Sequence, residues 1–429
     1  MKKSRKILAL CLALAMVVLC FTACGDGEKK PEADAGNENK VLSIDEVEKT
    51  VSKASDPVAK KDIKVGFIFL HDENSTYDKN FMDAAAAVQK KLGLTDDQVI
   101  YKVNIPEGDE CYNAAAELVD AGCDVIFADS FGHEPYMLKA AKEFPEVQFC
   151  HATGTNAQTA LTPNFHNAFA SIYEGRFLAG VAAGMKLNEM IESGKITAEQ
   201  AKIGYVGAFP YAEVKSGFTS FFLGARYICP SVTMEVKYTN SWFDIALEKE
   251  SALALIKNKC VLISQHADSE GAPKACEENN IPNIAYNIDT AKELKCENTA
   301  IISSKINWAP YFELMINSVI EGKAIPVDWC GGIKEGSVQL TALNEKAAAE
   351  GTQAKIDEIK GKLEDGSLNV FDTETFKVDG KKLDTYLADV VSDDKFTPDS
   401  EAIIDGEFSE STHRSAPYFD IIIDGITEI

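Results

Sequence analysis

The sequence from Lys64 onward alternates short apolar runs with helix-like segments, and this alternation occurs in two consecutive sets. Short apolar runs between turn residues are typical of strands that are buried on both faces of a parallel sheet. The first set predicts strands at 65–70, 99–103, 124–128, 147–151 and 165–171, and the second at 203–207, 233–238, 261–265, 283–286 and 300–303. We therefore expect an α/β fold of two doubly wound, Rossmann-like lobes joined by a hinge.

Helical patterns between and after the strands divide the chain further. They predict helices at 80–92, 109–121, 134–143, 173–191, 309–321 and 344–363. We expect lobe 1 at 62–172, a hinge helix with lobe 2 at 173–308, and a return through the hinge to lobe 1 at 309–363. Residues 331–343 alternate like an antiparallel or edge strand.

The segment 364–429 is a C-terminal extension to which the sequence assigns no function. Its Asp379-Gly380 pair is a turn signal inside a hairpin-like stretch, and residues 418–425 are mostly apolar. We expect these pieces to form a small added sheet on one of the lobes.

The first 24 residues are organised like an export signal. An almost wholly apolar stretch at 7–20 follows a basic start and ends in Thr22-Ala23-Cys24, which matches a bacterial lipobox. We expect residues 1–23 to be a signal peptide, Cys24 to carry acyl chains such as palmitate, and 24–60 to form a tether with a short helix. An uncleaved membrane helix is the alternative, but the stretch is shorter than the roughly 20 residues that a bilayer core requires. The expected location is the extracytoplasmic face of the cell membrane, through the lipid anchor.

Charge and cysteine content exclude several classes of protein. The chain of 429 residues has a formal net charge of -24, which would repel nucleic acid and other polyanions. Of its 11 cysteines, those beyond the signal region show no C-x-x-C spacing, so neither a zinc site nor a redox pair is predicted. Several lie in apolar stretches, which favours buried free thiols over a disulfide framework. We expect a monomer without a metal or cofactor.

An exported chain of two α/β lobes is expected to be a ligand-capturing receptor that closes about its hinge. In open α/β sheets the ligand binds outside the carboxyl ends of the strands. The loops at these ends carry the candidate site residues, which are Asp72, Tyr77, Ser130 and His151 in lobe 1 and Trp242, His266, Asp268, Asn287 and Lys305 in lobe 2. Side chains of both lobes should therefore converge on one cleft.

The residue types at these positions suit a flat heterocyclic ligand. Tyr77 and Trp242 can form opposite walls, one from each lobe, and offset stacking contributes roughly 0.5–1.5 kcal/mol per ring pair. A carboxylate of Asp72 or Asp268 would accept a hydrogen bond from a ring N–H or an exocyclic amine. His266 beside Asp268 could also indicate a metal, but no third ligand is marked and the spacing is not H-x-x-x-H, so no metal site is predicted.

Four segments carry a resemblance to a known family, namely IYEGRFLAGVAAG at 172–184, VGAFPYAEVKSGFTSFFLGAR at 206–226, TNSWFD at 239–244 and SQHADSEGAPKAC at 264–276. In this order they resemble the basic membrane protein family over roughly residues 62–345. The resemblance implies a type I periplasmic-binding-protein fold, a substrate-binding lipoprotein of an ABC importer, an ABC permease as partner, and a purine nucleoside or nucleobase as ligand. It also implies that Asp72 reads the base edge and that Tyr77 stacks on the ring.

The chain departs from the family pattern in lobe 2. The family's ribose-binding aspartate is replaced by Asn287, or its role has moved to Asp289. A family lysine that reaches the ribose falls at or beside Lys305, and the loop containing His266 replaces a glycine-rich loop. These departures leave a free base, or another flat heterocycle, as an alternative ligand.

The competing class is an exported nucleoside-processing hydrolase. No G-x-S-x-G motif occurs, and Cys150 and His151 are neighbours on a strand, so their side chains point to opposite faces. A two-lobed transcription regulator would share the fold, but it requires a helix-turn-helix and a basic face. We therefore predict ligand binding without turnover.

Overall fold

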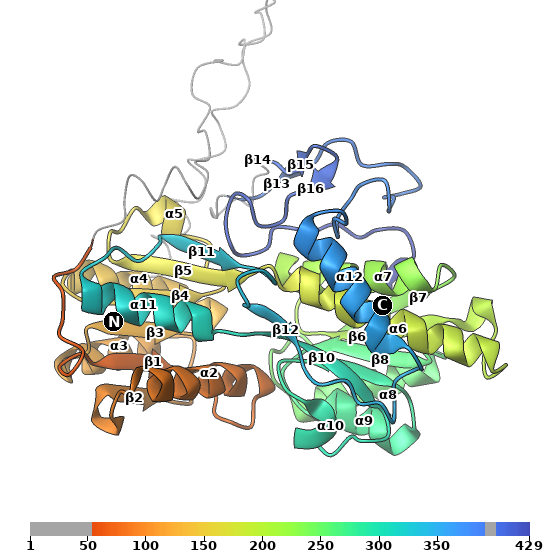
Figure 1. Cartoon of the computed structure of the whole chain (residues 1–429), viewed down its shortest axis with the longest axis horizontal. Coiled ribbons are helices and arrows are strands. Elements are labelled where there is room, and N and C mark those ends of the chain that lie inside the picture. The colour runs from red at the N-terminus through yellow and green to blue at the C-terminus, as the bar shows by residue number, and fades with distance from the viewer. Residues whose placement is uncertain (1–53, 391–399) are drawn as a thin grey trace, which may run out of the picture. The chain divides into compact units, whose positions relative to one another are not determined.

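The computed structural model describes residues 54–390 and 400–429 of the chain (Figure 1). The predicted signal peptide, Cys24 and the predicted tether up to residue 53 lie outside the described residues. The described chain forms two large sheets, each accompanied by helices. We call the six-stranded sheet with its helices lobe 1 and the seven-stranded sheet with its helices lobe 2.

The sheet of lobe 1 is wholly parallel and has the strand order β11-β5-β4-β3-β1-β2. Its strands are β1 (Val65–Ile68), β2 (Val99–Lys102), β3 (Val125–Ala128), β4 (Gln148–Ala152), β5 (Phe165–Ala170) and β11 (Asp328–Gly331). Its helices are α2 (Thr76–Leu92), α3 (Asp109–Asp120), α4 (Glu134–Glu143), α5 (Ala157–Ala160) and α11 (Ala309–Glu321). Since the strand order reverses at β1, a crevice opens at the carboxyl ends of β1 and β3.

The sheet of lobe 2 repeats this winding in the order β12-β10-β9-β8-β6-β7-β17. Its strands are β6 (Lys202–Gly207), β7 (Thr233–Tyr238), β8 (Leu262–His266), β9 (Asn283–Tyr286), β10 (Ala300–Ile306), β12 (Val338–Leu340) and β17 (Ile426–Glu428). Its helices are α6 (Ile172–Glu192), α7 (Ala212–Ile228), α8 (Ile245–Lys257), α9 (Gly271–Asn279), α10 (Thr290–Glu293) and α12 (Thr352–Asp365). Only β12, at one edge, runs antiparallel to its neighbour.

The predicted fold class is confirmed, since both sheets are doubly wound and contain the strands expected from the apolar runs. The predicted edge strand within 331–343 corresponds to β12. The helix predicted at 344–363 was wrong in its first part, because α12 begins only at Thr352. Asn344 instead donates through Nδ2 to the carbonyl oxygens of Glu297 and Ala300, and Gly351 adopts a left-handed φ of 78°.

Helix α2 begins at Thr76, earlier than its apolar pattern predicted. The preceding Ser75 is extended, and its hydroxyl accepts a hydrogen bond from the backbone N–H of Asp78, which is the usual N-cap arrangement. Gly93 ends the helix with a left-handed φ of 67° and donates to the carbonyl oxygens of Gln89 and Lys90. The early start brings Tyr77 and Asp78 into the first helical turn, directly after β1.

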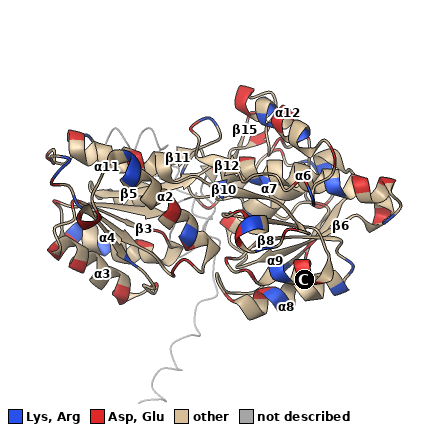
Figure 2. Cartoon of the chain, turned by 60° about the horizontal axis from the view of Figure 1, so that its bottom comes forward, with Lys and Arg blue, Asp and Glu red and all other residues tan. Residues whose placement is uncertain are grey.

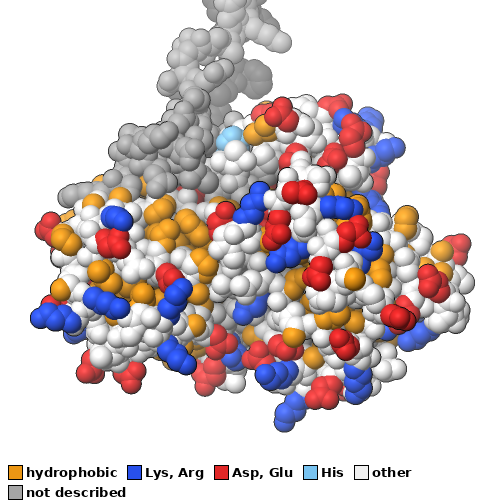
Figure 3. All heavy atoms as spheres, in the orientation of Figure 1, with side chains coloured by type: hydrophobic (Ala, Val, Ile, Leu, Met, Phe, Trp, Pro, Cys, Tyr) orange, Lys and Arg blue, Asp and Glu red, His pale blue; other side chains and the backbone are white. Residues whose placement is uncertain are grey.

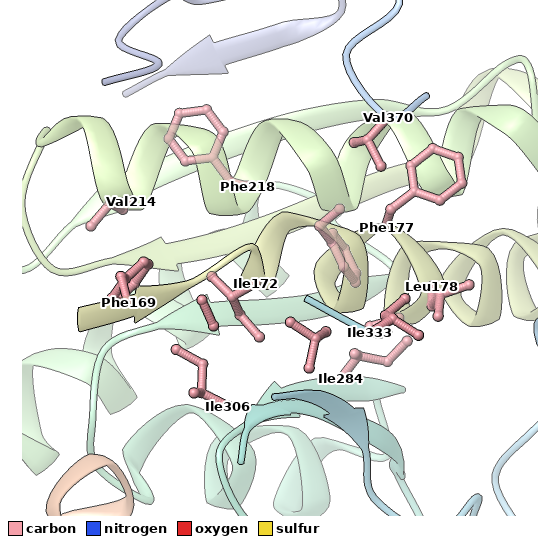
Figure 4. Close-up of a cluster of buried hydrophobic side chains, with 14 of the residues drawn as sticks. Phe169, Ile172, Phe177, Leu178, Val214, Phe218, Ile284, Ile306, Ile333 and Val370 are labelled. Atoms are coloured by element: carbon pink, nitrogen blue, oxygen red, sulfur yellow. The ribbon is translucent and has the colours of Figure 1, made fainter. Parts of the chain in front are cut away.

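Helix α6 is buried between the sheet of lobe 2 and helix α7 (Figure 4). Ile172 and Leu178 of α6 lie toward Ile284 and Ile306 of the sheet, and Phe218 of α7 lies on the other side. Because α6 is buried nearly all round, its sequence is apolar along most of its length rather than amphipathic. It directly follows β5, so it connects the two sheets.

The C-terminal extension forms two small two-stranded sheets and adds β17 to lobe 2, rather than the one added sheet that was expected. The small strands are β13 (Leu387–Ala388), β14 (Ser400–Glu401), β15 (Ile403–Ile404) and β16 (Glu407–Phe408). The predicted turn is confirmed, because Asp379 and Gly380 both have positive φ, at 51° and 76°. Val378 and Lys381 exchange backbone hydrogen bonds across it.

The cysteines of the described chain agree with the sequence analysis. The eight cysteines there are free, seven of them buried and Cys330 half-buried, as predicted. Acidic and basic side chains are interspersed on helices such as α8 and α12 (Figure 2) and over the face shown in Figure 3.

Candidate ligand-binding site

A small cavity lies where the carboxyl ends of the two parallel sheets meet. Lobe 1 contributes the ends of β1, β3 and β4 and the first turn of α2, and lobe 2 contributes the ends of β8 and β9, the loop after β7 and the first turn of α7. We call it the inner cavity, and it is lined by Leu70, Tyr77, Ser130, Phe131, Thr153, Glu213, Trp242, His266, Asp268 and Tyr286. The structure thus brings together five predicted site residues, which are Tyr77, Ser130, Trp242, His266 and Asp268.

Tyr77 and Trp242 supply aromatic surface from opposite lobes. The Tyr77 hydroxyl donates to the carbonyl oxygen of Asp129 at 2.8 Å, and its ring meets Phe81 edge-on with centroids 4.8 Å apart. The Trp242 ring meets Phe209 edge-on at 5.2 Å. Both rings are therefore held in place before a ligand arrives, which lowers the entropic cost of stacking on them.

Asp268 places a carboxyl group in the same lining and is 4% exposed. Its Oδ1 accepts a hydrogen bond from the hydroxyl of Tyr286. Burial, reinforced by the nearby carboxylates of Glu248, Asp78 and Glu213, raises the pKa of Asp268 well above its usual range. Such a carboxyl either retains a proton or requires a further hydrogen-bond donor, and a ligand N–H would satisfy it.

Tyr286 and Arg176 were not predicted as site residues. Tyr286 ends β9, and the Arg176 guanidinium lies 4.1 Å above the centroid of its ring. Nη1 of Arg176 donates to the carbonyl oxygen of Gln265 at 2.9 Å. Arg176 thus supports the floor of the inner cavity from α6.

His266 and Glu213 form the polar contact of lobe 2. Nε2 of His266 lies 3.4 Å from Oε1 of Glu213, which begins α7 and was not predicted. Burial and the nearby Arg176 lower the pKa of His266 to about 4, so its ring is neutral near pH 7. Among residues 54–390 and 400–429, no group of three or more His, Cys, Asp and Glu side chains could hold a metal ion.

Ser130 and His151 belong to one hydrogen-bonded unit in lobe 1. Nε2 of His151 lies 2.6 Å from the carbonyl oxygen of Ser130, whose hydroxyl donates to Glu107 Oε1 at 2.5 Å. His151 is fully buried and does not line the inner cavity, and burial lowers its pKa. It therefore supports the loop that carries Ser130.

Asp72, Asn287 and Lys305 also lie outside the lining. The Asp72 carboxylate accepts hydrogen bonds from the backbone N–H and the side chain of Asn74. Asn287 has a left-handed φ of 72° and donates its backbone N–H to Ser304. Lys305 is partly buried in β10, which lowers its pKa. The ligand roles assigned to these residues by resemblance remain predictions.

Direct contacts join the two lobes around the inner cavity. The carbonyl oxygen of Asp268 accepts from the backbone N–H of Thr76 at 2.9 Å and from its hydroxyl at 3.1 Å. Nδ2 of Asn80 donates to the carbonyl oxygen of Ile306 at 2.7 Å, and Lys79 lies 3.4 Å from Glu293. The enclosed volume is about 20 Å³, room for about one water molecule. This is a closed arrangement of the lobes.

Two doubly wound lobes that close over a cavity of aromatic and carboxyl groups define a solute-binding protein. The comparison with protein families makes this specific, because residues 68–369 match the Bmp family, described as ABC transporter substrate-binding protein PnrA-like. The chain belongs to this family. It is therefore the extracytoplasmic substrate-binding component of an ABC transporter, and not an enzyme, which decides against the hydrolase alternative.

Relatives of known name agree with this class. A purine-binding protein of Brucella abortus is 31% identical over 336 residues, which is 76% of this chain and 87% of the relative. A protein of Haloferax volcanii, named as a candidate glucose-binding protein of an ABC transporter, is 33% identical over 217 residues and 51% of each chain. The solved solute-binding protein of an ABC transporter system from Aeropyrum pernix K1 covers 72% of this chain and 93% of its own, with a TM-score of 0.59 and 18% identity. This last likeness concerns the fold alone. Within the described residues, no helix is long and apolar enough to cross a membrane.

Proposed function

We propose that this chain captures a purine base or nucleoside outside the cytoplasm and delivers it to an ABC permease. The inner cavity of this closed arrangement has room for only about one water molecule, so the lobes would move apart to admit the ligand between Tyr77 and Trp242. Asp268 would then accept a hydrogen bond from a ring N–H or an exocyclic amine. Acyl chains at Cys24 would keep the loaded receptor beside its permease.

The observation that carries this proposal is the pairing of aromatic rings from opposite lobes with a buried carboxyl in one lining. A purine is apolar on its faces and polar at its edge, so it satisfies both kinds of group at once. The purine-binding relative from Brucella abortus supports the same ligand class. The Haloferax volcanii relative makes a sugar the rival, because sugars also pack against aromatic rings.

The ligand can be identified directly. Small molecules released from the purified, denatured chain would be analysed by mass spectrometry, and calorimetry would then test purine bases, their nucleosides and glucose. We expect purines to bind and glucose not to bind. Binding of glucose with no response to any purine would refute the proposed ligand.

A pair of tryptophan variants tests the place of binding. Trp242→Ala should weaken purine binding about tenfold or more, because stacking and buried area are lost. Trp329→Ala is the matched control, since Trp329 is also half-buried but packs on Tyr311 with centroids 5.3 Å apart, outside the inner cavity. Equal losses in both variants would argue against the proposed site.

Lipid attachment at Cys24 requires a separate test. Cells fed an alkyne-bearing fatty acid should label the chain, and Cys24→Ala should abolish the label and release the protein from the membrane fraction. Unchanged labelling of the Cys24→Ala variant would exclude this residue as the anchor.

A further inference from the structure

A second and larger cavity adjoins the inner cavity, and nothing in the proposed function uses it. We call it the outer chamber, and its volume is about 420 Å³. It shares with the inner cavity the side chains Phe131, Thr153, Glu213 and Trp242. Ligand cavities in proteins typically measure about 300–1,000 Å³, so the outer chamber is large enough for a small molecule and the inner cavity alone is not.

The C-terminal extension supplies one wall of the outer chamber. This wall comprises Asp389, Arg414, Ala416, Pro417, Tyr418 and Asp420. All of these residues lie beyond the segment that matches the family, which ends at residue 369. The chamber is therefore a feature that the extension adds to the family's cleft.

The wall is fixed to both lobes by buried hydrogen bonds. On the lobe 1 side, Asp328 of β11 accepts from the backbone N–H of Ser415 at 2.8 Å, and Asn167 of β5 donates to the Ser415 hydroxyl at 3.0 Å. On the lobe 2 side, the hydroxyl of Ser216 in α7 donates to Glu410, which is 2% exposed. Because both anchors are buried, the wall is built into the fold rather than laid loosely on the surface.

The chamber is largely apolar, and most of its charged side chains are acidic. Phe131 and Tyr211, which are 41% and 46% exposed, face each other there from opposite lobes with ring centroids 6.0 Å apart. The acidic side chains in its lining are Glu213, Asp389 and Asp420. Arg414 is the one cation of the described lining, and its guanidinium already donates to the carbonyl oxygens of Ala416, Val390 and Pro417.

We propose that the outer chamber is the second half of the ligand site, where the extension holds the part of a purine ligand that projects from the inner cavity. That part is neutral, as in a free base or a nucleoside. A phosphate group would meet acidic side chains and an arginine that already uses Nε, Nη1 and Nη2 to bind backbone carbonyl oxygens, so nucleotides are rejected. This inference rests on the proposed function, since it specifies which purine derivatives the same cleft accepts.

A charge reversal in the wall tests the inference. Calorimetry of the full-length chain would compare a purine base, its nucleoside and its 5′-monophosphate. The wild type should bind the monophosphate at least about 100-fold more weakly than the nucleoside. Asp420→Lys should reduce the ratio of nucleoside affinity to monophosphate affinity about tenfold, with a larger effect at low salt.

Asp384→Lys is the matched control, because Asp384 lies in the same extension, is exposed and does not line the chamber. It should leave the ratio unchanged. A second pair probes the apolar wall, since Tyr211→Ala should weaken the nucleoside about tenfold, whereas Tyr227→Ala, at the other end of α7 and 47% exposed, should not.

The outcomes separate the two proposals. If the wild type binds the base but Asp420→Lys and Asp384→Lys have the same ratio of nucleoside affinity to monophosphate affinity, the proposed role of the outer chamber is refuted. The proposed function is then unaffected. If the wild type binds the monophosphate as tightly as the nucleoside, the proposed selectivity of the outer chamber against nucleotides is also refuted. A wild type that binds none of the three compounds overturns both.

Discussion

Helices α6 and α7 approach each other through glycines, and adding one methyl group there should destabilise the protein. A Cβ atom on Gly180 of α6 would lie 2.0 Å from the carbonyl oxygen of Phe221 in α7. A Cβ atom on Gly224 of α7 would lie 2.0 Å from the carbonyl oxygen of Phe177 in α6. Ordinary van der Waals contact begins at 3.4 Å. In Gly180→Ala the two helices would therefore have to move apart by about 1.4 Å, which is the difference between 3.4 Å and 2.0 Å.

The contacting atoms belong to the backbone of a buried helix, so no side-chain rotation can relieve the overlap. Overpacking of a core typically costs about 1–3 kcal/mol, and this overlap lies at the upper end. The higher helix propensity of alanine relative to glycine offsets only about 0.5–1 kcal/mol of this cost. We therefore expect Gly180→Ala to lower the free energy of unfolding by about 2 kcal/mol, as measured by urea denaturation.

Gly361→Ala provides the control. Gly361 lies inside α12, where an added Cβ would meet no atom within 4 Å. The same chemical change should there stabilise the protein by about 0.5–1 kcal/mol. Equal urea midpoints for Gly180→Ala and wild type would refute the close packing of α6 against α7.

Three further predictions concern buried hydrogen bonds. Burial raises the pKa of Glu410 from 4.5 to about 7, so its contribution to stability is complete below pH 4.5 and is lost as the pH rises through 7, by about 3 kcal/mol in total; urea denaturation at pH 5 and pH 8 should show a clearly larger loss of stability for wild type than for Glu410→Gln, in which the raised pKa of Glu248 leaves a remaining loss. Tyr286→Phe removes the donor to Asp268 and should destabilise the protein by about 1–3 kcal/mol at pH 8, whereas an unchanged urea midpoint would mean that the bond contributes nothing. Ser415→Ala removes the hydroxyl that donates to Asp328, which should cost about 1.5–3 kcal/mol and make the extension more susceptible to proteolysis; a cleavage rate equal to that of wild type would contradict its role as an anchor.

The strands that could be predicted are those buried on both faces, because their apolar runs stand out in the sequence. Two strands of the large sheets were missed, and both lack this signal. β11 (Asp328–Gly331) has the sequence DWCG and is only partly buried, and its first residue is a carboxylate that binds the extension. β17 (Ile426–Glu428) is a short edge strand whose partner β7 lies far earlier in the chain. Pairing of such distant segments leaves no local pattern.

The site residues that could be predicted lie in polar or aromatic loops that come directly after strands, as Trp242 and Asp268 do. Tyr286 was missed because it is the last residue of a buried strand, where a tyrosine resembles core. Asp72 stands nearest β1 in sequence, but the N-cap at Ser75 starts α2 early enough to leave Asp72 in a turn with Asn74 and to bury Asp78 instead. Which of two nearby aspartates points inward depends on such cap geometry, and local sequence does not determine it.

Asp268 connects ligand binding to closure of the lobes. Its carbonyl oxygen accepts from Thr76 of the opposite lobe, and its carboxyl is buried in the inner cavity. Closing the cleft gains the Thr76 hydrogen bonds and simultaneously removes water from the carboxyl, which is costly unless a proton or a donor is supplied. A ligand with an N–H at its edge offsets that cost only in the closed state, so it shifts the equilibrium toward closure by its differential affinity. A ligand of the same shape without a donor would stack on Tyr77 and Trp242 yet leave the carboxyl unsatisfied, and the lobes would remain open more of the time.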